Sequence, residues 1–377
     1  MTHRTLCPGL ALAVALVGLT FLWPSVTAQT SGIDALLRSH FHFTTAQVME
    51  VQRGRAVSVS LPGSLDREMV AAGAVRIDAP AERLLEVVRD IQKFESGGGF
   101  LKTVRISNPP RASDFAALAL PAEDVTDLRR CRPGDCDVKL GKRAFEQLAA
   151  IDRQARDADA RVQQFMRRMA LESVEAYRNS GTAALDVTLD ERLPRQVAAE
   201  FDQMLAATPW LKASMPDLAD YLVRYPNAPR PNGLEEYFYW SFVEFGLKTV
   251  LRVNHVVLYP MPGAGPARWA LANRQIYASH YFQNALEVRL LVDDGAQGSR
   301  AHYMMVLNVA RPDGLTGLFG PLVRYKVRSG AREALRKTLV GTKRRCETQE
   351  RGNVGTGERG TVGPWERGTV GPPRDRS

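Results

Sequence analysis

The hydrophobic and polar positions of the C-terminal half alternate with period two, which is the pattern of half-buried strands. Short turn sequences, such as the Asp-Asp-Gly run at 293–295, interrupt this alternation. We therefore predict five consecutive strands with short connections, which is the arrangement of an antiparallel meander. The predicted strands cover 235–245, 249–259, 269–282, 285–292 and 301–310.

Most of the other folded segments follow the helical period of 3.6 residues. Over 82–94 apolar residues recur at helical spacing directly after a predicted strand, and Asp78 and Pro80 suit the start of a helix. Residues 322–339 form another amphipathic pattern after the meander. The remaining expected elements are helices at 42–52, 143–179, 194–206 and 215–224, and strands at 56–61, 68–77 and 101–106.

This order of elements predicts an α+β fold. An antiparallel sheet is followed by a long C-terminal helix, and a helical insertion at about 107–233 separates the first strands from the meander. The chain has 377 residues, of which 45% are hydrophobic, and is long enough to bury a sizeable core. We assign the folded domain to residues 29–341.

The two ends of the chain have a different composition. Arg4, an apolar run over 10–23 and a small-residue site ending at Ala28 have the order of a secretory signal. We predict cleavage of residues 1–28 and a periplasmic or secreted protein; the alternative is an uncleaved anchor, although the run is shorter than the roughly 20 residues of a typical span. Residues 342–377 contain a repeat with a period of eight and are predicted to be disordered.

Three cysteines follow the predicted cleavage site. Cys131 and Cys136 flank the loop Arg-Pro-Gly-Asp, and an oxidising compartment favours a disulfide between them. Their spacing differs from that of thioredoxin-like pairs, and the further Cys or His residues of a zinc site are not nearby. Cys346 is either a free thiol or an intermolecular link.

The formal net charge is +9, and the leader and the tail together carry four of these charges, which leaves a mild charge of about +5 on the folded region. No basic run interleaved with aromatic residues suggests a groove for nucleic acid, so we expect no nucleic-acid partner. The basic surface is either simply solvated or permits peripheral contact with an anionic membrane.

The segment Asp-Ala-Pro-Ala-Glu-Arg-Leu-Leu-Glu-Val-Val-Arg-Asp-Ile at 78–91, placed after a strand and combined with a final helix behind a meander, resembles the START-like (SRPBCC, helix-grip) superfamily. The resemblance covers about 68–106 and 234–340, and the large insertion departs from the compact pattern of that superfamily. Segments 239–248 and 276–282 also resemble an uncharacterised group of exported bacterial proteins. The superfamily resemblance implies a cavity between sheet and C-terminal helix that holds a lipid, a sterol or another hydrophobic molecule.

Polar residues among apolar ones in these strands are the candidate ligand-binding residues. Alternation puts Phe238, Trp240, Phe242 and Glu244 on one face, which is the makeup of either a pocket wall or a filled core. Buried titratable groups have shifted protonation equilibria and occur at functional sites, but a hydrogen-bonded structural residue is the alternative for each of them. The candidates are Trp240, Glu244, Lys248, Arg252, His255, Arg274, Tyr277 and His280.

The sequence leaves three classes of function open. The leading hypothesis is an exported protein that binds a hydrophobic small molecule or lipid. A hydrolase or cyclase that uses the same cavity is the second, although common catalytic, metal-ligand and phosphate-loop motifs are lacking and we expect no cofactor or metal. The third is an envelope scaffold, which predicts a filled core and apolar surface on the helix at 143–179.

Overall fold

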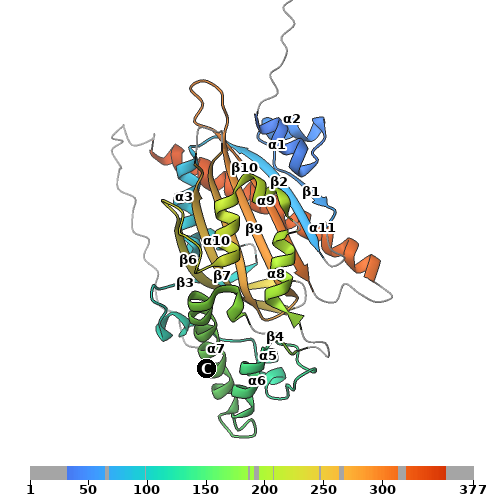
Figure 1. Ribbon diagram of the computed structural model, residues 1–377, viewed down its shortest axis with the longest axis vertical. Coiled ribbons are helices and arrows are strands. Elements are labelled where there is room, and N and C mark those ends of the chain that lie inside the picture. Colours follow the sequence, from blue (N-terminus) through green and yellow to red (C-terminus); the bar gives the residue numbers. More distant parts are fainter. Residues whose placement is uncertain are drawn as a thin grey trace, which may run out of the picture.

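The computed structural model describes residues 32–63, 68–97, 99–185, 187–190, 195–206, 208–245, 248–262, 267–312 and 320–353. The predicted signal peptide and most of the low-complexity tail lie outside the described residues. The described part is a mixed α+β structure built on an eight-stranded antiparallel sheet, as the sequence pattern predicts (Figure 1).

The sheet has the order β1-β2-β10-β9-β8-β7-β6-β3, so the five strands of the meander are neighbours and the three early strands flank them. All adjacent strands run antiparallel. The strands are β1 (Val57–Leu61), β2 (Met69–Ile77), β3 (Phe100–Ile106), β6 (Glu235–Phe245), β7 (Lys248–Pro260), β8 (Ala267–Ala278), β9 (Phe282–Asp293) and β10 (His302–Pro312).

One face of the sheet carries α3 (Ala81–Arg89), α4 (Ile91–Phe94) and the long helix α11 (Gly320–Asn353). The apolar positions of α3 pack against strand residues of this face, with Leu335 and Leu339 of α11 in the same cluster. The helix predicted at 82–94 is divided at Asp90, whose carboxylate accepts a hydrogen bond from the backbone N–H of Lys93 and so caps α4.

The opposite face is covered by the N-terminal helices and by the insertion, part of which extends past the end of the sheet (Figure 1). The insertion also contributes a two-stranded sheet, β4 (Val187–Thr188) and β5 (Arg195–Gln196), and two 3₁₀ turns, Ala112–Phe115 and Gly181–Ala184. The α-helices are α1 (Gly32–Phe41), α2 (Thr45–Gln52), α5 (Ala122–Leu128), α6 (Lys142–Ala149), α7 (Ala158–Ser180), α8 (Val197–Ala206), α9 (Pro209–Ser214) and α10 (Pro216–Arg224).

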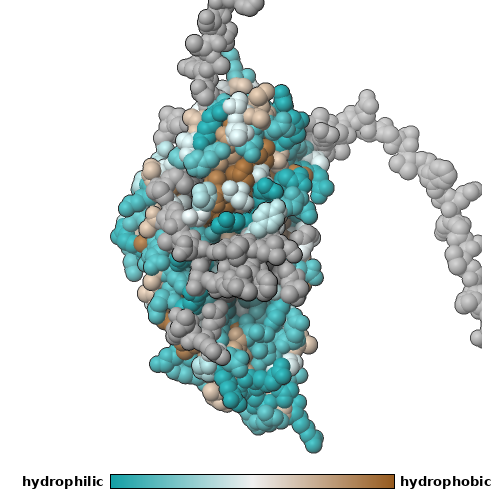
Figure 2. Space-filling model, turned by 90° about the vertical axis from the view of Figure 1, so that its right-hand side faces the viewer, coloured by the Kyte–Doolittle hydropathy of each residue, from teal (hydrophilic) through white to brown (hydrophobic). Residues whose placement is uncertain are grey.

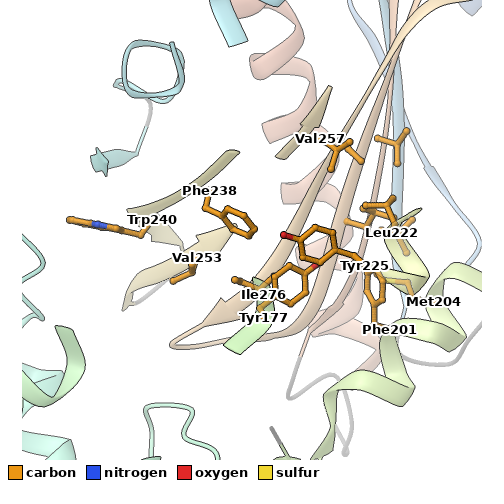
Figure 3. Close-up of a cluster of buried hydrophobic side chains, with 14 of the residues drawn as sticks. Tyr177, Phe201, Met204, Leu222, Tyr225, Phe238, Trp240, Val253, Val257 and Ile276 are labelled. Atoms are coloured by element: carbon orange, nitrogen blue, oxygen red, sulfur yellow. The ribbon is translucent and has the colours of Figure 1, made fainter. Parts of the chain in front are cut away.

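A large aromatic core joins the insertion to the sheet. Tyr177 of α7 and Tyr225 stack with ring centroids 5.0 Å apart, and Phe238 of β6 meets the ring of Tyr177 edge-on at 6.1 Å. Trp240 and Phe201 are fully buried in the same cluster, as Figure 3 shows. The insertion therefore shares one hydrophobic core with this face of the sheet.

Three predicted boundaries were wrong. The helix expected at 143–179 is two helices, because the polar segment 150–157 turns where the Asp152 carboxylate accepts the N–H of Gln154. The pattern at 269–282 ends as a strand at Ala278, and the following turn contains Tyr281 at a φ of 64°.

The third error concerns the boundary at 341, since α11 continues to Asn353. Thr342 and Cys346 are buried there, and the Lys343 ammonium donates to the carbonyl of Arg76 at 2.8 Å. Tertiary contacts thus order the first part of the segment that composition alone marks as disordered.

Among the described helices, none is both long enough and apolar enough to cross a bilayer. Figure 2 shows one side of the molecule, where the described surface is largely hydrophilic and hydrophobic residues gather in one patch in its upper half.

Candidate functional site: a cavity between the sheet and the last helix

A cavity of about 920 Å³ lies between the sheet, helices α3 and α4, and helix α11. Val88, Ile91 and Phe94 form its wall on the side of α3 and α4, while Val256 and Leu271 contribute from the sheet. The volume is at the upper end of the range of small-molecule sites, and the mixture of apolar walls with a few polar groups is typical of them. The cavity can therefore hold a ligand of considerable size.

Four amide side chains of the sheet line this cavity, and we call them the amide belt. They are Asn254, Asn273, Gln275 and Asn308. Asn254 of β7 is directly opposite Gln275 of β8, and Asn273 is opposite Glu287 of β9. Glu287 is in turn opposite Asn308 of β10. Because side chains of opposed residues point to the same face of a sheet, the belt is a continuous polar row across four strands.

A buried ion pair stands at one end of the belt. The Arg252 guanidinium lies 3.1 Å from the carboxylate of Glu95, which is 7% exposed. Tyr239 donates its hydroxyl proton to Glu95 at 2.8 Å and accepts a hydrogen bond from Asn273 at 2.9 Å. Burial and the adjacent carboxylate raise the pKa of Tyr239 well above its ordinary value, so its hydroxyl stays protonated.

A second ion pair lies beside the belt on β9. The Arg289 guanidinium is 2.6 Å from the carboxylate of Glu287 and lies over the ring of Phe94, 4.7 Å from its centroid. The two carboxylates next to the belt, those of Glu95 and Glu287, are therefore each paired with an arginine. These two pairs add no net charge beside the belt.

Of the eight predicted ligand-binding residues, two line this cavity. Arg252 does so through its pair with Glu95, and Glu244 lies near the end of β6 with an exposed side chain. Lys248 begins β7 and pairs instead with Asp137 of the insertion at 2.7 Å.

The aromatic strand residues that the sequence predicts as the cavity wall lie on the other face of the sheet. Trp240 and its neighbours Phe238 and Phe242 belong to the core shared with the insertion, and not to the cluster that contains Leu335 and Leu339 of α11. Tyr277 is also on the insertion side, where its hydroxyl donates to the carbonyl of Lys139 at 3.0 Å. It lines a smaller cavity, of about 320 Å³, between β8 and the insertion.

His255 and Arg274 belong to a buried hydrogen-bond chain on the insertion side. Arg274 donates to the Tyr177 hydroxyl at 3.1 Å, and that hydroxyl lies 3.3 Å from Nδ1 of His255. Nε2 of His255 lies 2.9 Å from the carboxylate of Glu236, which also accepts the hydroxyl of Tyr221 at 2.8 Å. Burial lowers the pKa of His255 even though Glu236 opposes this shift, so the chain contains a neutral imidazole.

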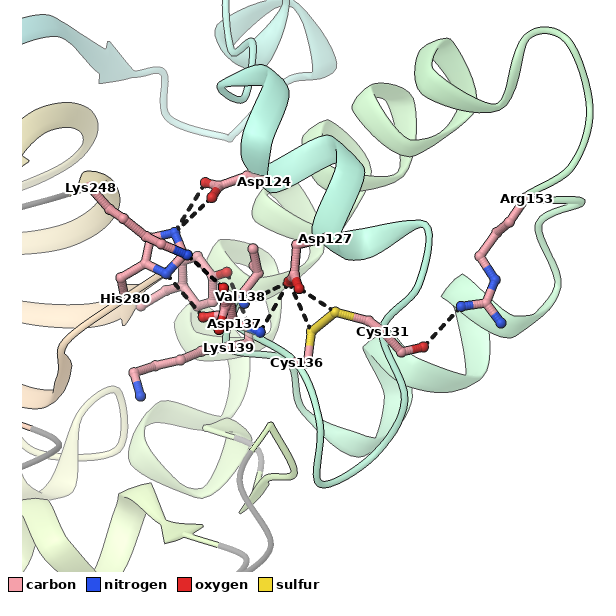
Figure 4. Close-up of a disulfide and its surroundings, with 11 residues drawn as sticks. Asp124, Asp127, Cys131, Cys136, Asp137, Val138, Lys139, Arg153, Lys248 and His280 are labelled. Atoms are coloured by element: carbon pink, nitrogen blue, oxygen red, sulfur yellow. Dashed lines mark hydrogen bonds and ion pairs between the residues drawn. A yellow bond between two sulfur atoms is a disulfide. The ribbon is translucent and has the colours of Figure 1, made fainter.

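His280 ties the turn after β8 to the insertion. Nε2 lies 3.0 Å from the carboxylate of Asp124, and Nδ1 lies 2.9 Å from the carbonyl of Asp137 (Figure 4). His255 and His280 thus have separate partners, and neither of them is near Glu244 in the contacts of the described residues. The described residues therefore do not bring His255, His280 and Glu244 together as the two histidines and one carboxylate of a metal site.

Cys131 and Cys136 form a disulfide with Cα atoms 4.7 Å apart. The carboxylate of Asp127 lies 3.1 Å from the sulfur of Cys131 and accepts the backbone N–H groups of Asp137 and Val138. Burial raises the pKa of Asp127, although the N–H of Val138 opposes this shift. Because the two sulfurs are bonded to each other, this group does not offer the thiolates that a metal would bind.

Sequence reasoning missed the amide belt and the residues Glu95 and Arg289. The sequence does contain a sign of this belt. Three strands that are otherwise apolar each carry two polar residues separated by one position, at 252 and 254, 273 and 275, and 287 and 289. Such pairs mark one face of a strand, but pairing register is needed to show that they meet.

The sequence was compared with protein-family models and with curated proteins, and nothing matches in either comparison.

Proposed function

We propose that the protein is an exported binding protein that holds a hydrophobic small molecule or lipid in the cavity beneath α11. The observation that carries this proposal is the cavity of about 920 Å³ between the sheet and the helices α3, α4 and α11. A filled core would place side chains in that space, as the aromatic cluster around Tyr177, Phe201 and Trp240 does over much of the opposite face of the sheet.

The arrangement of the elements supports the resemblance to the START-like superfamily. A strand leads directly into α3, a meander follows the insertion, and the last helix lies across the sheet with the cavity beneath it. The Cys131–Cys136 disulfide supports an oxidising compartment, in agreement with the predicted signal peptide.

The rim that α11 contributes to the cavity is basic. Arg328, Lys337 and Arg344 line it and have exposed side chains. Positive charge on an exposed helix favours approach to an anionic membrane surface, which supports peripheral contact as a route for a lipid into the cavity.

The envelope scaffold has less support. It predicts apolar surface on the helices at 143–179, yet the large hydrophobic residues that are well exposed in the described part of the chain lie elsewhere. They are Met49, Leu101, Val223, Tyr325 and Val340.

Native mass spectrometry of the mature protein tests the proposal, before and after incubation with a total lipid extract. We expect a stoichiometric adduct that organic extraction releases for identification. Ala331 of α11 lines the cavity, so Ala331→Trp should narrow it and markedly weaken formation of the adduct. Val340→Trp is the matched control, because Val340 lies on the same helix, outside the cavity, and is 46% exposed. An apo mass without uptake, or an adduct as abundant in Ala331→Trp as in Val340→Trp, would contradict the proposal.

A further inference from the structure

The amide belt presents buried polar atoms that have no protein partner within the described residues. Asn254 is 3% exposed and Gln275 is 5% exposed, yet Nδ2 of Asn254 and Nε2 of Gln275 make no hydrogen bond. The carbonyl oxygens Oδ1 of Asn273 and Asn308 are unpartnered as well. Buried polar groups are nearly always hydrogen-bonded, so four unpartnered amide atoms on residues that line one cavity indicate a binding surface.

A ligand that satisfies these atoms must both accept and donate hydrogen bonds. The free nitrogens of Asn254 and Gln275 are donors, whereas the free oxygens of Asn273 and Asn308 are acceptors. The orientation of Asn273 follows from its neighbour, because the Tyr239 hydroxyl donates its hydrogen bond to Glu95 and its oxygen accepts one from the Asn273 nitrogen. A hydroxyl group both donates and accepts, so a ligand with several hydroxyls satisfies both kinds of atom.

The charges around the belt argue against an ionic group at this place. Glu95 is paired with Arg252, and Glu287 is paired with Arg289. An anionic group at the belt would lie near two carboxylates, and a cation would lie near two guanidinium groups. The remaining free polar atoms belong mostly to neutral amides, although Nε of Arg252 adds one more donor.

We propose that the ligand is an amphiphile whose uncharged, hydroxyl-bearing part binds the amide belt while its hydrocarbon part occupies the apolar remainder of the cavity. This inference rests on the proposed function and specifies the ligand class. Apolar walls are available on both sides of the belt, with Val256 and Leu271 toward one end and Phe100 and Val250 toward the other.

Two probes with the same chain, decyl glucoside and decyl phosphate, test this proposal when their binding is measured by calorimetry below their micelle concentrations. The glucoside is neutral and has four hydroxyls, so we expect it to bind at least about tenfold more tightly than the phosphate. One or two good hydrogen bonds account for a factor of this size.

Asn254→Leu and Gln275→Leu should each weaken the binding of decyl glucoside by about tenfold. Neither should lower the melting temperature of the free protein, because each removes an unpartnered buried polar atom. Asn284→Leu is the matched control: Asn284 is a buried amide of β9 outside this cavity, and although its Oδ1 is unpartnered among the described residues, its nitrogen donates to the Val197 carbonyl of the insertion. This variant should lower the melting temperature and leave glucoside binding unchanged.

Equal affinity for the two probes, or unchanged glucoside binding in both belt variants, would overturn the hydroxyl assignment while the proposed cavity function would stand. Failure of both probes to bind, together with an apo mass that shows no lipid uptake, would overturn the two proposals together.

Discussion

The histidine buried between sheet and insertion should make the stability of the protein depend on pH in a defined direction. His255 accepts from the Tyr177 hydroxyl at Nδ1 and donates to Glu236 from Nε2, which is the bonding pattern of a neutral ring. Burial lowers its pKa below the ordinary 6.5. The unfolded chain therefore takes up a proton that the folded protein excludes, and stability must fall as the pH falls through 6.5.

The size of the loss of stability follows from the single proton that His255 binds in the unfolded chain. A proton taken up by the unfolded chain alone costs at most about 1.4 kcal/mol of unfolding free energy per pH unit below 6.5, so lowering the pH from 7 to 5.5 should cost up to about 1 kcal/mol through His255. Burial alone would raise the pKa of Glu236, but its hydrogen bonds, with that from His255 the largest, lower it to about 2. The carboxylate thus stays ionised over this range, and its stabilising contribution is lost only as the pH falls through 4.5 toward 2.

Urea unfolding of the wild type and of His255→Gln at a series of pH values measures this contribution. The variant should be less stable at pH 7, by roughly 1–3 kcal/mol for the broken hydrogen bonds, and its stability should decline less on acidification. Burial also lowers the pKa of His302, so His302→Gln should remove a comparable slope independently. If the wild type gained stability relative to His255→Gln as the pH fell, His255 would be a charged partner of Glu236 and the reasoning would be refuted.

Three further predictions concern stability and reactivity. Replacing Cys131 and Cys136 together by Ser should lower the unfolding free energy by about 2 kcal/mol, the loop-entropy value for so short a loop; urea denaturation that shows no loss would contradict this. A Cβ at Gly73 would lie 2.8 Å from the Leu339 side chain of α11, so Gly73→Ala should lower the melting temperature. Gly330→Ala should raise it slightly, because a Cβ there would have nothing within 4 Å and alanine favours the helix. Burial raises the pKa of Cys346 to about 12, so this thiol should react with a maleimide only after denaturant is added; labelling of the native protein would show that the end of α11 is open.

Local pattern was sufficient for most elements of the fold. Runs of strand-forming residues bounded by turn sequences located all five strands of the meander, because both signals are local and need no partner, even though both faces of the sheet are covered. The end of β8 was misplaced because the turn at 279–281 contains His280 and Tyr281, which continue the aromatic pattern of the strand. The break between α6 and α7 depends on a side-chain hydrogen bond of Asp152, which apolar periodicity does not report.

The candidate site was predicted less well, for a reason that lies in the sheet itself. Alternation separates Trp240 from Tyr239 but does not say which of them meets α11, since both faces of this sheet are covered by helices and both are apolar. Trp240 and two phenylalanines of β6 pack against the insertion, whereas Tyr237 and Tyr239 are on the side of α11. The less conspicuous Asn254 and Gln275 were left facing the cavity.

The sequence by itself determined the α+β class, the order of the strands of the main sheet, the insertion and the presence of a final amphipathic helix, because these follow from local periodicity and turn residues; the short helices α1, α5 and α9 were not predicted. Only the tertiary structure decided which face of the sheet α11 covers, that Glu95 and Arg252 meet across 157 positions of the chain, and that four amides form one row. The physical reason is that register and face are set by packing between distant segments, and a shift of one residue would exchange the two faces.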